Sequence, residues 1–246
     1  MQTDDEKILL RHIEDIEKLA TRYNCARFGD FLDEVQTALV EEKFPNAVLY
    51  GGGEYSQRKM AGFFPDWQEC DFAEFPISVI RIDKKGNREL THRDYLGTVM
   101  SLGIERKKIG DIVVDGEGCY IYAEADISEH IKDSITKIAN CGVRCKIVPT
   151  DEVVMLEPKF EILDIVVSAM RADAVCGAIL KLSRNKATEL IASGKVMVNH
   201  KEIADKDFGL CESDLLSIRG FGRAQIYEIG NNTRSGKLHV KIKKYI

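Results

Sequence analysis

The middle of the chain carries an alternation of patterns that leaves few topologies open. "FPISVIRID" is predicted to be a strand, "THRDYLGTVMSLG" a helix that Thr91 caps and Gly103 ends, and "IGDIVVDG" and "GCYIYAEA" two strands joined at a glycine-containing turn. The next segment, "ISEHIKDSITKIA", spaces its isoleucines as an amphipathic helix does: Ile127, Ile131, Ile135 and Ile138. "GVRCKIVP" is a closing strand. The predicted order is therefore β-α-β-β-α-β.

This order is that of the ferredoxin-like or RRM-like fold, which many functions share. An RRM stacks RNA bases on aromatic side chains of its central strands, and Tyr120 and Tyr122 do alternate onto one face of the third strand. The first strand, "ISVIRI", offers no aromatic partner. Packing or interface roles are therefore favoured for the two tyrosines over base stacking.

Residues 1–75 begin with helical signals. "EKILLRHIEDIEKLATRY" has an apolar side at helical spacing, and "FGDFLDEVQTALVEE" is predicted to be a second helix, so we expect a helix-rich lobe. "AVLYGGGEYSQRKMAGFFP" runs from a short strand into three glycines and then Arg58 and Lys59. A phosphate-binding Walker loop needs Ser or Thr after its lysine, and Met60 stands there instead, which argues against a nucleotide site.

Charge is distributed unevenly along the chain. The whole sequence has 35 Lys and Arg against 40 Asp and Glu, whereas residues 171–246 have 14 against 8. A basic C-terminal part on an acidic carrier is typical of a module that binds a polyanion, although an ordinary fluctuation gives the same count.

Composition bounds the remaining classes. The 246 residues can bury sizeable cores, and the acidic beginning, "MQTDDEKILL", predicts neither a secretory signal nor a membrane span. Seven dispersed cysteines fit reduced thiols in the cytoplasm. The one close pair, Cys141 and Cys145, lacks the further ligands of a zinc site, so we expect no metal and no cofactor.

The C-terminal part predicts two helices followed by a hairpin. "FEILDIVVSAM" is predicted to be a strand and "RADAVCGAILKL" an amphipathic helix. Ser183 is placed to cap a second helix that Gly194 ends, with a buried side made of Ala187, Leu190 and Ile191. "KVMVN" and "HKEI" then form a strand and its return.

Arg184 and Lys186 fall in the first turn of this second helix. Positive charge is unfavourable there by a few tenths of a kcal/mol to about 1 kcal/mol, because the helix dipole is also positive at its N-terminus. A phosphate would reverse the sign, since backbone N–H groups and two cationic side chains would then converge on an anion. Solvated surface charge is the alternative, and the pair in this setting favours phosphate.

The same residues resemble the small RNA-binding domain named after ribosomal small-subunit protein S-four. The matching positions are Arg171, Asp173, Ser183, Arg184, Ala187, Gly194, Val196, Val198 and Asn199. Ala172 replaces the usual leucine, and Ser213 stands where a glycine normally precedes Asp214, so packing and a turn are expected to differ there.

Further motifs resemble the YlmH family of bacterial proteins across most of the chain: "GGGEYSQRKMAGFFPD", "LTHRDYLGTVMSLGIERKKIGDIVV" and "RGFGR". The resemblance implies an RRM-like middle domain (76–155) and an S-four-type domain with C-terminal strands (156–246). Together with the helix-rich N-terminal lobe (1–75) that periodicity predicts, these make an α+β protein. It also implies binding to structured rRNA or tRNA at the large ribosomal subunit, in the rescue of stalled translation. We expect no membrane or DNA partner.

The candidate RNA-binding residues are polar or cationic side chains of the C-terminal part: Arg171, Ser183, Arg184, Lys186, Lys195, Asn199, Lys201, Arg219 and Arg223. Candidates for a second contact with RNA or the ribosome precede them in the chain: Arg58, Lys59, His92, Arg93, Arg106, Lys107 and Lys108.

Two other classes compete with a non-catalytic RNA-binding protein. S-four-type domains accompany enzymes that act on RNA, but no nucleophile with a base is apparent here, so a catalyst would need an unrecognised active site. An adaptor linked to cell division would use the acidic N-terminal lobe and need no RNA. Copurification that survives or fails nuclease treatment separates the adaptor from the RNA-binding protein.

Overall fold

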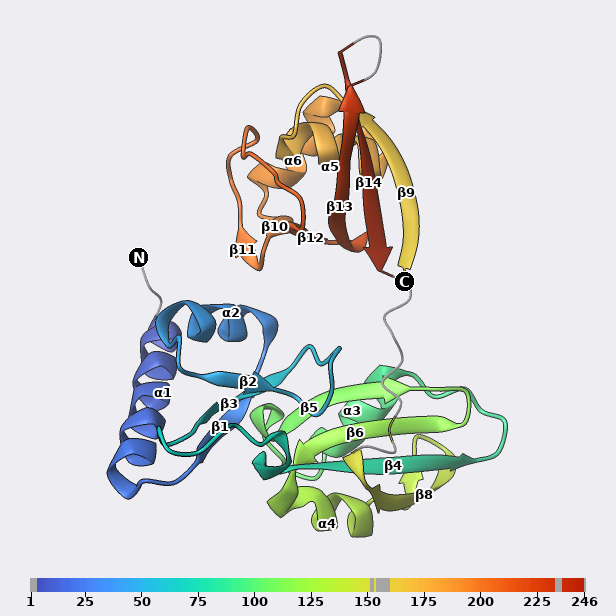
Figure 1. The fold of residues 1–246 in the computed structure, drawn as a ribbon. Coiled ribbons are helices and arrows are strands. Elements are labelled where there is room, and N and C mark those ends of the chain that lie inside the picture. The colour runs from blue at the N-terminus through green and yellow to red at the C-terminus, as the bar shows by residue number, and fades with distance from the viewer. Residues whose placement is uncertain (1–3, 151–152, 154–159, 233–235, 246) are drawn as a thin grey trace. The chain divides into compact units, whose positions relative to one another are not determined.

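The computed structural model describes residues 4–150, 153, 160–232 and 236–245. The chain divides into two compact units, Met1–Leu156 and Glu157–Ile246, each built from α-helices and antiparallel sheets (Figure 1). The predicted α+β class is confirmed. The predicted boundary between the second and third domains lies outside the described residues, and the separation of residues 1–75 from the middle domain stays a prediction.

The elements of the first unit are α1 (Asp4–Tyr23), β1 (Arg27–Leu32), α2 (Glu34–Lys43), β2 (Val48–Tyr50), β3 (Lys59–Phe63), η1 (Phe72–Glu74), β4 (Ile77–Lys85), α3 (His92–Met100), η2 (Arg106–Lys108), β5 (Ile109–Val114), β6 (Gly118–Glu124), α4 (Ala125–Ser134), β7 (Lys137–Ile138) and β8 (Cys141–Val148). Those of the second unit are β9 (Phe160–Val167), α5 (Ala172–Leu180), α6 (Arg184–Ala192), β10 (Val196–Val198), β11 (Lys201–Glu202), β12 (Leu215–Ile218), β13 (Gly222–Asn232) and β14 (Leu238–Tyr245).

The first 75 residues contain a sheet as well as helices. β1, β3 and β2 form a three-stranded antiparallel sheet on which α1 and α2 pack. The predicted second helix is wrong in its first part, because residues 28–32 belong to β1. The helix begins only after Asp33, whose side chain accepts from the backbone N–H of Gln36 while the Gln36 side chain accepts from that of Asp33. This capping box fixes the start.

The middle of the chain has the predicted β-α-β-β-α-β order with one extra short strand. Its five strands pair antiparallel in the order β5-β6-β4-β8-β7, and the isoleucine-rich core lies between this sheet and the helices α3 and α4. The predicted second helix is too long. α4 ends at Ser134, and Ile138 lies in β7, paired with Cys141 across a tight turn. Ile135 and Ile138 are nevertheless buried. Their spacing therefore indicated which residues are buried, but not that they lie in a helix.

The opposite face of this sheet is covered by residues from the N-terminal part. Phe31, Met60 and Phe75 pack against Val79 and Tyr122 in one buried cluster. Tyr122 is completely buried, and Tyr120 lies under a guanidinium, that of Arg81, 4.5 Å from its ring centre. The expectation that the two tyrosines pack rather than stack on bases agrees with these contacts.

Gly52 makes this covering possible. Its φ of +98° lies in the left-handed region, and a Cβ at this position would come within 2.5 Å of the Tyr122 ring. Only glycine combines that backbone conformation with so close an approach. The glycine run of the sequence is thus explained, at this position, by packing against the middle sheet.

The second unit is a single antiparallel sheet with both helices on one face. Its six strands are ordered β11-β10-β12-β13-β14-β9, so that β9 pairs with β14 along eight residues of each strand. α5 and α6 pack together on one side of β13 and β14 (Figure 1), and the apolar core fills the space between them and the sheet.

Candidate nucleic-acid interface

The start of α6 is built as the sequence predicts. The hydroxyl of Ser183 accepts from the backbone N–H of Lys186 at 3.4 Å and caps the helix. Ala187 and Ile191 are fully buried, whereas Leu190 is only half-buried. Gly194, with a φ of +66°, follows the last turn. The helix is therefore anchored by its inner side and presents its first turn to solvent.

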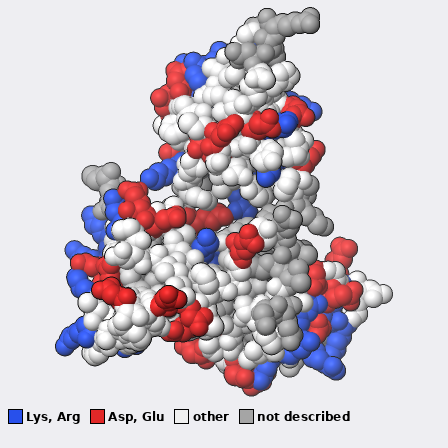
Figure 2. Space-filling view, viewed as in Figure 1, with Lys and Arg blue, Asp and Glu red and all other residues white. Residues whose placement is uncertain are grey.

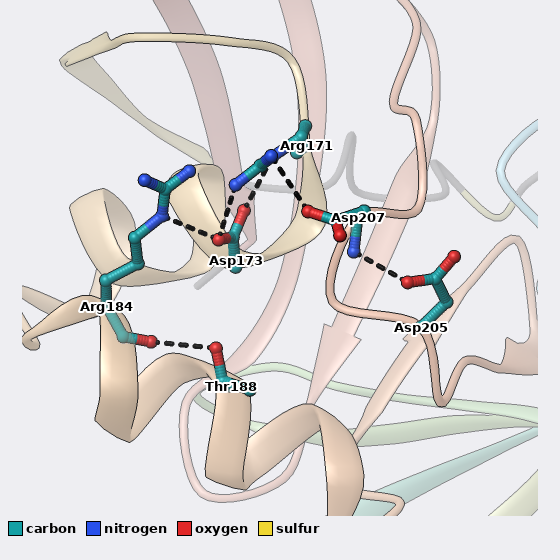
Figure 3. Close-up of polar contacts among 6 residues, drawn as sticks. All are labelled: Arg171, Asp173, Arg184, Thr188, Asp205 and Asp207. Carbon is teal, nitrogen blue, oxygen red and sulfur yellow. Dashed lines mark hydrogen bonds and ion pairs between the residues drawn. The ribbon is translucent and has the colours of Figure 1, made fainter.

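Two arginines converge on one carboxylate beside this turn (Figure 3). Asp173, in the first turn of α5, accepts from Arg171 Nε at 3.1 Å, from Arg171 Nη2 at 2.8 Å and from Arg184 Nε at 2.6 Å. Arg171 Nη1 also pairs with Asp207 at 2.8 Å. We call Arg171, Asp173 and Arg184 the arginine clamp. Arg184 is therefore held by an internal ion pair, a contact that the sequence did not predict.

The clamp keeps two guanidinium groups at the surface around a buried carboxylate. The Asp173 side chain is 3% exposed, whereas those of Arg171 and Arg184 are 34% and 52% exposed. Burial raises the pKa of Asp173, but the hydrogen bonds from the two arginines outweigh burial and hold this pKa below its ordinary value. Asp173 thus pairs with both guanidinium groups, and because Asp207 also pairs with Arg171, two carboxylates face the two arginines. Figure 3 shows the terminal nitrogens of Arg184 pointing away from Asp173.

Lys186 adds a third cation in the same turn. Its side chain is exposed, and its backbone N–H belongs to the capped helix start. Thr188, one turn further along α6, contacts the same turn, because its hydroxyl donates to the Arg184 carbonyl oxygen at 3.0 Å. Helix dipole, Arg184 and Lys186 all favour an anion at this position.

Asn199 lies in the turn of a hairpin and is used internally. Asn199 and His200 have φ values of +47° and +65°, as a two-residue turn between β10 and β11 requires. The Asn199 side-chain amide donates to Asp214 Oδ1 at 2.8 Å, and its oxygen accepts from the Leu215 N–H at 2.9 Å. The contacts of this side chain hold two turns of the unit together. Lys201, at the start of β11, is exposed.

The other candidates of the C-terminal part lie away from the clamp. The Lys195 carbonyl oxygen accepts from the Arg219 N–H at 2.9 Å, which makes these two residues neighbours. They follow the opposite end of α6, roughly 13 Å along the helix from Arg184. The Arg223 guanidinium lies 5.5 Å from the ring centre of Tyr245. The structure thus brings together Arg171, Ser183, Arg184 and Lys186, and places the rest elsewhere.

The candidates of the first unit are engaged to different degrees. Arg58 donates to the carbonyl oxygens of Phe31 and Ile109, each at 2.9 Å, and Arg106 donates to the same Ile109 oxygen. Burial lowers the pKa of Arg58, while burial and the neighbouring Arg58 lower that of Arg106 to about 10. Both stay charged near neutral pH, and Arg58 ties the segment after the glycine run to β1 and to the start of β5.

Lys107 and Lys108 face carboxylates. Lys108 Nζ lies 3.0 Å from Asp30 Oδ1 and 2.6 Å from Glu124 Oε2, and Lys107 Nζ lies 3.4 Å from Asp30 Oδ2 and 3.3 Å from Glu105 Oε2. Their charge is therefore largely neutralised within the unit. The remaining candidates lie at the surface or near it: Lys59 in β3 is half-buried, and His92 and Arg93 are exposed in the first turn of α3.

The role of Asp173 as the organiser of the site is not apparent from the motif that its position matches. The signal available in the sequence was an acid two residues after Arg171, on the predicted helix that precedes Arg184. Only the fold shows that this acid is buried and that Arg184 reaches it. Asp207, from the loop after β11, had no local signal.

The described residues contain neither a candidate metal site nor a candidate membrane span. No group of three His, Cys, Asp or Glu side chains in the described ranges could hold a metal ion. The Cys141 thiol contacts the Lys85 and Gly142 carbonyl oxygens, and the Cys145 thiol the Ile135 carbonyl oxygen. None of the helices described is long and apolar enough to cross a membrane.

A small α+β module with a cationic helix start has the chemistry of a protein that binds polyanions. Residues 70–152, in the other unit, match a family model described as "Putative RNA-binding domain in YlmH". A ribosome-associated protein quality control protein P2 of Bacillus subtilis is 28% identical over 247 residues, which cover 98% of this chain and 95% of that protein. A structure of the cell division protein ylmH from Streptococcus pneumoniae is 27% identical, with a TM-score of 0.51, and covers 62% of this chain and 96% of its own. The resemblance to the YlmH family is confirmed.

Proposed function

We propose that this protein binds structured RNA without modifying it, and that the arginine clamp with Lys186 is its principal phosphate contact. The clamp carries the proposal because a buried carboxylate fixes two half-exposed guanidinium groups at a helix start. Arginines held in this way lose little side-chain entropy when they meet a phosphate, and they bind it with two parallel hydrogen bonds. The basic excess of residues 171–246 supports the same partner.

The second unit is proposed to be an S-four-type domain and the middle of the first unit an RRM-like domain. Support comes from the matching motif positions around α5 and α6, and from the strand order β5-β6-β4-β8. The central face of the RRM-like sheet is covered by N-terminal residues, with Tyr122 completely buried. RNA that contacts this domain must therefore use its rim or loops, where candidates such as Arg93 lie.

The physiological RNA is proposed to be rRNA or tRNA at the large ribosomal subunit, in the cytoplasm, during rescue or quality control of stalled translation. Support for the ribosome comes from the name of the Bacillus subtilis relative, which is ribosome-associated and acts in protein quality control. The choice of subunit and of tRNA follows from the resemblance stated for the sequence.

Salt dependence of binding tests the proposal directly. If roughly five phosphates are neutralised, the slope of log affinity against log salt for purified protein and ribosomal particles should be about −3 to −5. Mass spectrometry of the same RNA after incubation should find no altered nucleotide. A flat salt titration is incompatible with phosphate recognition, and a modified base would make the protein an enzyme.

An adaptor function in cell division is the second candidate. The observation that favours it is the name of the Streptococcus pneumoniae relative, a cell division protein. Sedimentation of the protein with its partners from a cell lysate separates the two: nuclease should release an RNA-binding protein, whereas partners that remain after nuclease treatment favour the adaptor.

A further inference from the structure

The first unit contains a pocket that the RNA contacts proposed above do not use. Its volume is about 650 Å³. Tyr50 at the end of β2, the glycine run and Phe72 of η1 line it, and Thr150 and Val153 after β8 form another side. All of these residues belong to the first unit. A pocket of this volume holds a small ligand or one long side chain of a partner.

Aromatic rings form one wall of this pocket. The Tyr50 ring contacts two others, with its centre 4.7 Å from that of Phe72 and 5.2 Å from that of Phe75. Phe75 is 4% exposed and belongs to a buried cluster, whereas Phe72 is 52% exposed. One side of Phe72 therefore rests on Tyr50, while much of its ring stays open. The faces of aromatic rings carry partial negative charge, which attracts cations.

Local hydrogen bonds hold Phe72 in its position. Asp71 caps η1, because its carboxylate accepts from the Ala73 N–H at 2.9 Å. The Phe75 N–H donates to the Phe72 carbonyl oxygen at 3.3 Å and closes the turn. A ring that its own backbone fixes in this way loses little conformational entropy when a ligand meets it.

The charge around the pocket is negative. Glu54 lines it, is exposed, and forms no ion pair with any residue that the structure describes. None of the described residues in the lining is Lys, Arg or His. Residues 64–75, which carry Phe72, include four acids and no basic residue. The whole of residues 1–156 has 20 Lys and Arg against 29 Asp and Glu, and Figure 2 shows acidic groups across the visible side of the first unit.

These features narrow the choice of occupant. A phosphate or an acidic peptide would meet the Glu54 carboxylate without a cationic partner, at a cost in repulsion and desolvation. A wholly apolar group would leave the carboxylate unused. An organic cation with an apolar stem suits both the rings and the acid. Arginine fits this description best, because its weakly hydrated guanidinium stacks on aromatic faces and pairs with carboxylates through two parallel hydrogen bonds.

We propose that this pocket binds an arginine side chain from a basic segment of a partner protein, with the guanidinium over the open side of Phe72 and paired with Glu54. A protein is favoured over a free polyamine because exposed apolar rings surround the site. Tyr55, at 39%, is exposed as well as Phe72, and the neighbours of an arginine in a protein would cover both rings. The inference goes beyond the proposed function, since it concerns a protein partner and not RNA.

Titration of the full chain with a short peptide tests this assignment. The probe is a peptide of alternating glycine and arginine with blocked ends, and its control carries citrulline, a neutral analogue of similar shape, in place of arginine. Proton NMR of the probe should show the arginine methylene signals moving upfield as protein is added, because protons above an aromatic ring are shielded. The citrulline peptide should show no such movement.

Variants of the pocket separate the ring from the charge. Phe72→Ala should lower the affinity for the arginine peptide about 5- to 30-fold, and Phe72→Trp should retain or raise it, because tryptophan is the best cation–π acceptor. Glu54→Gln should lower the affinity about 2- to 5-fold, since solvent screens an exposed carboxylate. Phe208→Ala, which removes an exposed phenylalanine of the second unit, is the matched control and should bind as the parent does. Phe72→Trp and Glu54→Gln keep the test decisive if Phe72→Ala melts early.

Several results would overturn the proposal. Equal binding of the citrulline peptide, or no upfield movement with the parent protein, rules out recognition of a cation at the rings. Spermidine that binds in a manner dependent on Phe72, while the arginine peptide does not, replaces the protein partner by a free polyamine. Structured RNA should bind Phe72→Ala as tightly as the parent, and a loss there would assign the pocket to RNA. The peptide and RNA titrations therefore fail independently of each other.

Discussion

Arg184→Gln should weaken RNA binding far more than it weakens the fold. In the folded protein Arg184 supplies one of the three hydrogen bonds that Asp173 accepts from arginines, at 2.6 Å, and the other two come from Arg171. Asp173 therefore keeps a charged partner in the variant. Because the Arg184 side chain is 52% exposed, solvent screens the lost contact, and we expect a loss of about 0.5–1.5 kcal/mol in unfolding free energy.

The effect on RNA is expected to be larger. A charge-assisted contact to phosphate contributes ~1.5–3 kcal/mol, so the affinity should fall roughly 10- to 150-fold. Lys186→Gln should weaken RNA binding in the same sense while leaving stability unchanged or a few tenths of a kcal/mol higher, because a cation leaves the positive end of the helix. Comparing the loss of stability with the loss of RNA affinity in each variant thus distinguishes Arg184, which is ion-paired with Asp173, from the exposed Lys186.

Urea unfolding and fluorescence anisotropy with structured ribosomal RNA at several salt concentrations measure the two quantities. Arg88→Gln, which removes an exposed cation from the first unit, is the matched control and should change neither. If Arg184→Gln destabilises the protein but binds RNA as the parent does, the ion pair with Asp173 is the whole role of Arg184 and the reasoning fails.

Four other perturbations test the packing and the charges. Asp173→Asn should cost stability at neutral pH, and because the folded-state pKa of Asp173 is lowered, the difference from the parent in urea unfolding should be full above about pH 4–5 and disappear as the pH falls through that lower pKa. Ile191→Ala should lower the unfolding free energy by ~2–5 kcal/mol through a core cavity, with RNA affinity preserved under conditions where the variant is folded. Ser213→Gly should raise the unfolding free energy by about 0.5–1 kcal/mol and with it the melting temperature, since the Ser213 φ of +71° suits glycine. An unchanged or lower melting temperature would contradict this. Gly52→Ala should destabilise the first unit by about 2–4 kcal/mol, because the new Cβ meets the Tyr122 ring, and near-UV circular dichroism of the aromatic core should report it.

Local chemistry made the start and end of α6 predictable. Ser183 and Gly194 have the conformations that capping and termination require, and these depend on near neighbours alone. Ser213 shows the same principle from the other side: the motif expects glycine there, and the residue has a left-handed backbone. Periodicity was less reliable at Ile138, because a buried two-residue strand satisfies the same spacing as one more turn of helix.

The arrangement of the site depended on contacts between distant residues. No pattern in the sequence says that Arg184 reaches back to Asp173 on the preceding helix, or that Asp207 reaches Arg171 from a loop. The same holds for Tyr122, which Phe31 and Met60 cover from far upstream and whose ring Gly52 approaches closely. The cationic side chains of Arg184 and Lys186 were enough to predict a phosphate contact from the sequence. The geometry of the clamp became visible only in the folded structure.

The pairing of β9 with β14 has a consequence for synthesis of the protein. In the sequence of the second unit β9 is the first described strand and β14 is the last, although the two are neighbours in the sheet. Their eight-residue ladder therefore cannot form until β14 has left the ribosome. During that interval β9 has no partner strand from the described sheet and β13 has one unpaired edge, and such unpaired strands associate with other chains. The nascent second unit is therefore most open to aggregation and to chaperones just before its final strand emerges, although α5 and α6 are already available to pack.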